Sequence, residues 1–368
     1  MSLPEIAGVL SAGDIAATAA TIAEVQDANG AIPWFTGGHT DPWDHVESAM
    51  ALDVGGHPDD AERAYGWLES TQAPDGSWAA AYENGIPTVE FSDTNFCGYV
   101  AVGTWHHHLV TGRRAFTERM WPVVRRALDH VIALQQPGGE IAWARTGDRP
   151  AREALLTSSS SLYQSLRAGL ALAQELGDPM PDWELAAGRL GHAVRCHPER
   201  FTDKRRFSMD WYYPILGGAV RGAAASRRLD ERWDEFWVPQ LGVRCVADRP
   251  WVTGAETCEL ALALHAAGDE DRALEVLTAM QHLRENDGSY WTGYVFEDNV
   301  RWPVERSTWT AAAVILATDA IAGGTGGSTI FRGDDLPLGV DPASVVCSSD
   351  GARTGGGSVV LCDTTQQP

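Results

Sequence analysis

A turn that recurs along the chain constrains the fold more than any other feature of this 368-residue sequence. Its clearest copy is Gln72-Ala-Pro-Asp-Gly-Ser-Trp78, and related turns occur at residues 26–34, 135–143 and 285–291. In the first three copies along the chain a glutamine precedes the glycine by four residues, and a tryptophan closes all four. Such repetition indicates an architecture of repeated units, each packed on its neighbours.

The recurring turns lie at the ends of amphipathic helices, and a second helix follows each of them. The first helices carry charged stripes, as at residues 58–63, so one face of each is expected to meet solvent. The second helices are rich in Ala and Gly and apolar nearly all round, so they are expected to be buried. The first helices are predicted at residues 12–26, 58–71, 119–136, 182–195, 231–241 and 270–283, and the second at 42–54, 96–110, 158–176, 211–227, 255–267 and 305–321.

Six such pairs predict an all-α fold in which an inner ring of six helices lies inside an outer ring of six. This (α/α)6 toroid lets each pair bury its apolar face against its neighbours. The toroid domain is expected to span residues 1–322. Residues 323–368 are rich in Gly, Ser and Thr and show little periodicity, so a disordered or loosely attached tail is expected there.

The charge balance excludes several classes of partner. A formal net charge of -22 and a pI near 4.8 argue against binding to nucleic acid or to an anionic membrane surface. No stretch reads as an integral membrane segment, and residues 1–13 lack the basic start of a secretory signal. A cytoplasmic protein that binds a small molecule is therefore expected. The sequence does not indicate whether it has a protein partner.

The recurring turns resemble the QW repeat of squalene and hopene cyclases and the related turns of prenyltransferase beta subunits. The resemblance covers residues 12–321 and rests on Gln72–Trp78 and on the turns at 26–34 and 285–291. It implies an (α/α)6 barrel with an active cavity near its axis. It also implies a transferase or cyclase that binds an isoprenoid substrate in that cavity.

The chain departs from that superfamily at its catalytic motifs. The DxDD acid motif of the cyclases is absent, because residues 57–60 read His-Pro-Asp-Asp. Asp93, Cys97 and Cys258 resemble part of the prenyltransferase zinc set, but the sixth inner helix lacks the histidine that would complete it. The three consecutive histidines at 106–108 point in different directions on a helix and cannot share one ion. Neither a metal nor a cofactor is expected.

Acidic and aromatic side chains gather where the inner helices begin. Helix capping explains some of these acids, but it does not require one at five of six helix starts. The candidate catalytic residues are Asp44, Glu47, Asp93, Glu256 and Glu305. The candidate substrate-binding residues are Trp43, His45, Glu90, Asn95, Tyr163, Asp210, Trp211, Tyr212, Tyr213, Trp302, Arg306 and Trp309.

Three classes of function fit this pattern. The leading hypothesis is a prenyltransferase-like or terpene-cyclase-like enzyme in which Asp93 or Asp44 donates a proton and aromatic faces stabilise cationic character. The second is a carbohydrate-active enzyme, since (α/α)6 barrels also resemble several glycoside hydrolase families. Asp44 with Asp93 or Glu256 would then act as acid and base. The third is a non-catalytic toroid that binds a protein or lipid partner.

Overall fold

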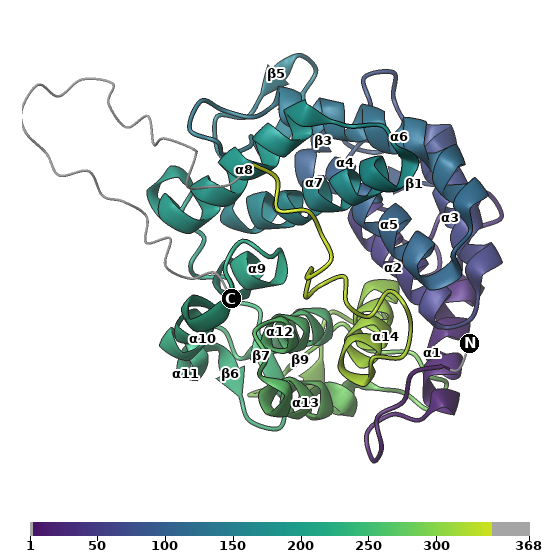
Figure 1. Ribbon diagram of the computed structural model, residues 1–368. Helices are drawn as coiled ribbons and strands as arrows, with labels where there is room; N and C mark the ends of the chain where they lie inside the picture. The colour runs from purple at the N-terminus through teal and green to yellow at the C-terminus, as the bar shows by residue number, and fades with distance from the viewer. Residues whose placement is uncertain (1–2, 341–368) are drawn as a thin grey trace, which may run out of the picture.

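The computed structural model describes residues 3–340, and it confirms the (α/α)6 toroid. Figure 1 shows the helices arranged as a closed ring around a central axis. The outer helices are α1 (Ala12–Val25), α3 (Pro58–Thr71), α6 (Arg114–Ala133), α8 (Pro181–Cys196), α10 (Gly222–Glu231) and α13 (Glu270–Ala279). The inner helices are α2 (Pro42–Val54), the consecutive α4 (Thr94–Gly98) and α5 (Val100–Thr111), α7 (Leu156–Leu176), α9 (Met209–Leu216), α12 (Gly254–Ala266) and α14 (Thr308–Ala322).

The inner helices pack closely because small residues lie at their contacts. A Cβ atom on Gly98 of α4 would come within 2.7 Å of Leu162 on α7, so only glycine allows that spacing. Around the ring, α2 contacts α5 on one side and α14 on the other, and α14 contacts α12. The helices α2 and α12 therefore flank α14. No helix within residues 3–340 has the length and apolar character to cross a bilayer.

The recurring turn ties neighbouring outer helices together. The Gln72 side-chain amide donates to the carbonyl of Gly76 in its own turn (3.0 Å) and to that of Val123 on α6 (3.0 Å). Gln26 and Gln135 make the same pair of bonds, to α3 and α8. Each turn thus satisfies a carbonyl of the next outer helix along the ring.

Glycine in the turn permits this contact. Gly76 has φ +89°, and a Cβ there would lie 2.5 Å from the carbonyl carbon of Arg126 on α6. The last copy docks on the first helix, because the hydroxyl of Thr18 on α1 donates to the carbonyl of Gly288 (2.9 Å). This contact joins the two ends of the helical repeat and closes the ring.

The fourth and fifth pairs differ from the prediction. Residues 211–227, predicted as the inner helix of the fourth pair, do not form one helix, since α9 ends at Leu216 before Gly217 and α10 begins at Gly222. The fifth pair differs in its outer helix. The segment predicted as an outer helix at 231–241 instead contains α11 (Trp233–Phe236) and a strand. The outer helix of this pair is α10.

Short strands, which the sequence did not predict, line the loops that lead into the inner helices. They form three small antiparallel sheets at the end of the barrel where those helices begin, called the mouth below. The strands are β1 (Tyr82–Glu83), β2 (Ile86–Pro87), β3 (Phe91–Asp93), β4 (Ala144–Thr146), β5 (Arg149–Pro150), β6 (Trp237–Val238), β7 (Gly242–Arg244), β8 (Trp251–Thr253), β9 (Gly293–Val295) and β10 (Val300–Arg301). In the largest sheet β8 pairs with β9, with Val252 opposite Tyr294. These strands run directly into α4 and α12 and fix how those helices start.

The opposite end of the barrel is crossed by residues 323–340, the first part of the predicted loose tail. In Figure 1 this yellow segment runs from α14 across the centre of the ring to α8. It is packed rather than loose, since Ile330 and Phe331 are buried and the Arg167 guanidinium on α7 donates to the carbonyls of Gly333 and Leu336. Its apolar contacts and the hydrogen bonds to its carbonyls hold the segment in place, although its Gly-rich composition favours a loose tail. Residues 341–368 of the predicted tail lie outside the described residues, and the domain division at 322 stays a prediction.

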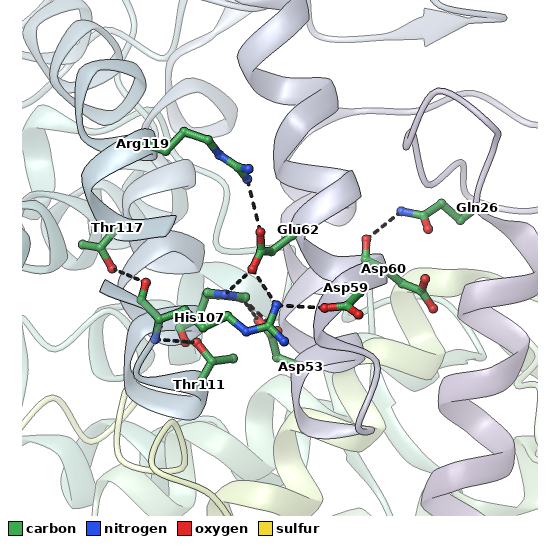
Figure 2. Close-up of polar contacts among 10 residues, drawn as sticks. Gln26, Asp53, Asp59, Asp60, Glu62, His107, Thr111, Thr117 and Arg119 are labelled. Carbon is green, nitrogen blue, oxygen red and sulfur yellow. Dashed lines mark hydrogen bonds and ion pairs between the residues drawn. The ribbon is translucent and has the colours of Figure 1, made fainter. Parts of the chain in front are cut away.

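The histidine run at 106–108 lies near this closed end, and its three side chains diverge. Figure 2 shows His107 beside Asp53 of α2, with Nδ1 2.9 Å from a carboxylate oxygen, and both side chains are fully buried. His107 Nε2 lies 3.8 Å from Glu62 of α3. His108 stacks on a tryptophan, and His106 lies beneath Gly327. The three histidines of α5 therefore contribute to helix packing, and His107 contacts both α2 and α3.

Candidate active site

Four carboxylates from two inner helices form two layers at the mouth. The first turn of α2 carries Asp44 and the first turn of α12 carries Glu256, while Glu47 and Glu259 lie three residues further along the same helices. Residues three apart share one helix face, so each helix presents its pair in the same direction. All four side chains are at least nine-tenths buried.

The deeper carboxylate of α2, Glu47, is saturated with hydrogen bonds. Its Oε1 accepts from the Trp43 indole (3.2 Å) and the Tyr99 hydroxyl (3.1 Å), and its Oε2 accepts from the Trp309 indole (2.9 Å). Burial raises the pKa of Glu47 to about 7, against the lowering effect of these three donors. Glu47 thus joins α2, α5 and α14 and fixes three aromatic rings.

The deeper carboxylate of α12, Glu259, is held in the same way. The hydroxyls of Tyr212 and Tyr213 on α9 donate to its two oxygens. Burial and the neighbouring Glu47 raise its pKa well above the usual range. The Tyr213 ring meets Trp43 edge-on at 5.8 Å, so the two glutamates share one aromatic layer. This layer forms the floor beneath Asp44 and Glu256.

Asp44 lies above that floor, beside a second aspartate. Asp41 caps α2 by accepting from the backbone N–H groups of Trp43 (3.0 Å) and Asp44 (2.9 Å). Burial raises the pKa of the Asp44 carboxyl well above its usual range, and the charge of Asp41 and a hydrogen bond to its carboxylate raise it further. The Asp44 carboxyl therefore holds its proton more strongly than an exposed aspartate does.

Glu256 is the carboxylate of the cluster with an unsatisfied oxygen. Within residues 3–340 its buried Oε2 has no hydrogen-bond partner. Burial raises the pKa of Glu256, while the side chains of Thr253 and Cys245 act in the opposite direction. An unpaired buried carboxylate oxygen is costly, and such groups concentrate at sites that bind a ligand.

Asp93 and Asp210 lie outside the two-layer cluster. Asp93 caps α4 by accepting from the N–H groups of Asn95 (2.9 Å) and Phe96 (3.3 Å), and burial raises its pKa to about 7. The Asn95 side chain is buried without a hydrogen-bond partner among the described residues. Asp210 accepts from Thr157 (2.8 Å) and lines a cleft of about 770 Å³ beside α10.

Three predicted substrate-binding residues point away from the mouth. His45 is fully buried, with one ring nitrogen bonded to the backbone N–H of Ile32 (3.0 Å) and the other to the carbonyl of Ala64 (2.9 Å). Trp211 donates to a carbonyl of α10 (2.7 Å) and stacks on Phe236. Tyr163 packs under Arg167 and against α8. The structure gives these residues roles in helix packing, because successive residues of a buried helix face different neighbours.

Four further candidates lie on the loops rather than on the helices. Glu305 precedes α14 and accepts from Thr292 (3.3 Å). Arg306 is bound to Asp287 of the last recurring turn (2.7 Å), away from the carboxylate cluster. Glu90 is exposed, and Trp302 is half exposed on the rim of the mouth.

Sequence reasoning missed Tyr99 as a site residue. It lies between α4 and α5 and completes the hydrogen bonding of Glu47. Its sequence neighbourhood is apolar, so no motif marked it. The only signal was the hydroxyl group on the fourth residue of a helix expected to be buried, since a buried hydroxyl requires a polar partner.

Comparisons with known proteins identify the kind of chemistry. No protein-family model matches the sequence. The chain is 58% identical over 340 residues to the MMP endo-(1,4)-3-O-methyl-alpha-D-mannosidase of Mycolicibacterium hassiacum, with 92% of this chain and 95% of that protein covered. In fold it is similar to a wild-type glycosidase, with a TM-score of 0.66, 14% identity and coverage of 85% of this chain and 98% of that one. It is also similar in fold to a D-mannose isomerase, with a TM-score of 0.65, 11% identity and coverage of 83% and 96%.

The predicted membership of the terpenoid cyclase and prenyltransferase superfamily is therefore wrong, and so are the isoprenoid substrate and the transferase activity. The recurring turn led to the wrong family because its role is structural. Its glutamine and glycine contact outer helices, so the motif indicates the toroid fold and not the reaction. The glycoside hydrolase alternative agrees with the close relative. The chain belongs to the family of the MMP endo-(1,4)-3-O-methyl-alpha-D-mannosidase, and it is a glycosidase.

Proposed function

We propose that this protein hydrolyses internal α-(1,4) bonds in a chain of 3-O-methyl-mannose units, with Asp44 as general acid and Glu256 as general base. The substrate class is carried over from the relative that is 58% identical over nearly the whole chain. The observation that carries the residue assignment is the two-layer cluster. Its deeper carboxylates are saturated with donors, and its upper ones lie in the first turns of α2 and α12.

The acid role of Asp44 follows from its surroundings. A general acid must hold a proton at neutral pH and release it to the departing glycosidic oxygen. Asp41 already accepts from the Trp34 indole (2.7 Å) and from the backbone N–H of Asp44 (2.9 Å), so its carboxylate is committed to the helix cap. Burial and the neighbouring Asp41 both raise the pKa of Asp44, which favours the protonated form that a general acid needs.

The base role of Glu256 follows from its open oxygen. A general base accepts a proton from water as that water attacks the anomeric carbon. Oε2 of Glu256 has the required vacant lone pairs, whereas both oxygens of Glu259 already accept from tyrosines. Glu47 and Glu259 are positioning residues in this proposal, since they hold the aromatic floor on which a sugar ring can rest.

Asp44→Asn and Glu256→Gln test the assignment. Each should lower kcat on a 3-O-methylated α-(1,4)-mannooligosaccharide by about 10²–10⁴-fold while KM changes little. The residual activity of Asp44→Asn should lose its fall at high pH, and that of Glu256→Gln its fall at low pH. Asp319→Asn serves as the matched control, because Asp319 is a buried carboxylate near the end of α14 and is not one of the candidate residues. Full activity in either cluster variant, with the fold intact by circular dichroism, would refute the assignment.

A further inference from the structure

A half-exposed tryptophan on the rim of the mouth is held in place by its main chain. Trp302 follows the edge strand β10, and its N–H donates to the carbonyl of Gly293 (3.0 Å). Its own carbonyl accepts from the Trp251 indole (3.0 Å), and the two rings meet edge-on at 4.9 Å. A Cβ on Gly293 would lie 2.5 Å from that indole nitrogen, so the frame is tightly packed. The ring is therefore fixed in position although half of it faces solvent.

Two valines extend this exposed apolar surface. Val300, Trp302 and Val304, together called the rim patch, are 46%, 50% and 85% exposed. They lie within five residues of one another on the loop that leads into α14. An apolar surface held rigidly in solvent marks a binding surface more often than a chance exposure. The fold thus holds the main chain and one ring edge of the rim patch, while about half or more of each of its three residues stays in contact with solvent.

The rim patch is connected to the catalytic carboxylates by a short path. Trp251 begins β8, and β8 runs directly into α12, whose first turn carries Glu256. The rise of a strand and a helix places Trp251 about 13 Å along this path from Glu256. A few linked sugar rings span such a distance. A polymer cleaved at the Asp44–Glu256 layer would extend past the rim.

We propose that the rim patch is an outer subsite that binds a distal 3-O-methyl-mannose unit of the substrate chain and selects methylated over unmethylated chains. This inference rests on the proposed function. A tryptophan face stacks on the C–H face of a sugar ring, and the valines offer apolar contact to the O-methyl groups. An unmethylated chain presents hydroxyl groups there, which would lose water without gaining hydrogen bonds from valine.

The charge of the surroundings fits a neutral ligand. The nearby side chains Arg301 and Arg306 are engaged, since Arg301 donates to the carbonyl of His282 and Arg306 pairs with Asp287. The patch therefore presents apolar surface, with its neighbouring cations already occupied. A methylated mannan carries apolar groups and no charge, which matches this composition.

Trp302→Ala and Val304→Ser test the proposal on methylated and unmethylated α-(1,4)-mannooligosaccharides of graded length. Trp302→Ala should raise KM on long methylated chains about tenfold and leave kcat and the shortest cleavable substrate unchanged. Val304→Ser should lower the preference for methylated over unmethylated chains. Leu185→Ala, at 48% exposure on the outer helix α8, is the matched control and should change neither.

Each outcome separates the two proposals. Wild-type protein that cleaves no methylated mannoside refutes the proposed function, and the rim subsite with it. Cleavage that Trp302→Ala leaves unchanged, or reduces equally for short and long chains, refutes the subsite alone. A wild-type dimer that Trp302→Ala dissociates, seen by analytical ultracentrifugation, would assign the rim patch to self-association instead.

Discussion

Replacing Gly76 with alanine tests whether the recurring turn holds neighbouring outer helices together. The new Cβ would lie 2.5 Å from the carbonyl carbon of Arg126, which belongs to the backbone of α6 and cannot move alone. Overpacking of this kind costs about 1–3 kcal/mol. The left-handed φ of +89° adds about 1–2 kcal/mol for any residue with a side chain. We expect a loss of about 3 kcal/mol in unfolding free energy, which corresponds to a fall in Tm of roughly 5 °C.

The assay is urea unfolding followed by tryptophan fluorescence, with calorimetry for the Tm. Gly112→Ala is the matched control, since Gly112 has φ +64° and a Cβ there would have no atom within 4 Å. It carries only the backbone cost, so it should lose about 1 kcal/mol. Equal losses in the two variants would show that contact with α6 does not matter, and the account of the turn would fail.

Two further predictions concern buried charge. The pKa of Glu47 is raised to about 7 in the folded protein from an ordinary value of 4.5, so the folded state binds more protons between these values and stability should fall as pH rises from 4.5 to 7. Unfolding titrations across this range should show a shallower slope for Glu47→Gln, and an unchanged slope would contradict the assignment. Arg167→Lys keeps the charge but cannot reach the carbonyls of Gly333, Leu336 and Pro337 together, so it should cost about 3 kcal/mol and expose residues 323–340 to limited proteolysis. Resistance equal to that of the wild type would show that the segment is held by its apolar contacts instead.

The sequence predicts most helices because their ends carry explicit signals. Asp41 with Pro42 marks the start of α2, and Pro58 marks the start of α3. The fifth pair lacks such signals, and there the prediction placed the outer helix nine residues too late. The packing of residues 323–340 was not predictable, since three arginine bonds from α7 hold a segment whose composition suggests a loose tail.

The candidate site was predicted by position but not by orientation. An inner helix is apolar on every face, so its sequence does not reveal which side meets the axis. Trp211 and Tyr212 are adjacent, yet Trp211 packs on α10 and Tyr212 binds Glu259. The distinction between Asp44 and Glu47 likewise depends on donors outside α2, the Tyr99 hydroxyl and the Trp309 indole. Such contacts are set by tertiary structure, and which of these acids carry the chemistry stays a proposal.

In the part of the chain that the structure describes, residues 323–340 cross the barrel at the end opposite to the mouth and obstruct it there. A polymer cannot be drawn through such a barrel from one end to the other, as it could through an open tunnel. An internal bond of the polysaccharide reaches Asp44 only if the polysaccharide bends into the mouth and both of its ends leave through the mouth. Each cut would then release two fragments past the same rim. The enzyme should therefore release its substrate after each cut and bind again before the next one.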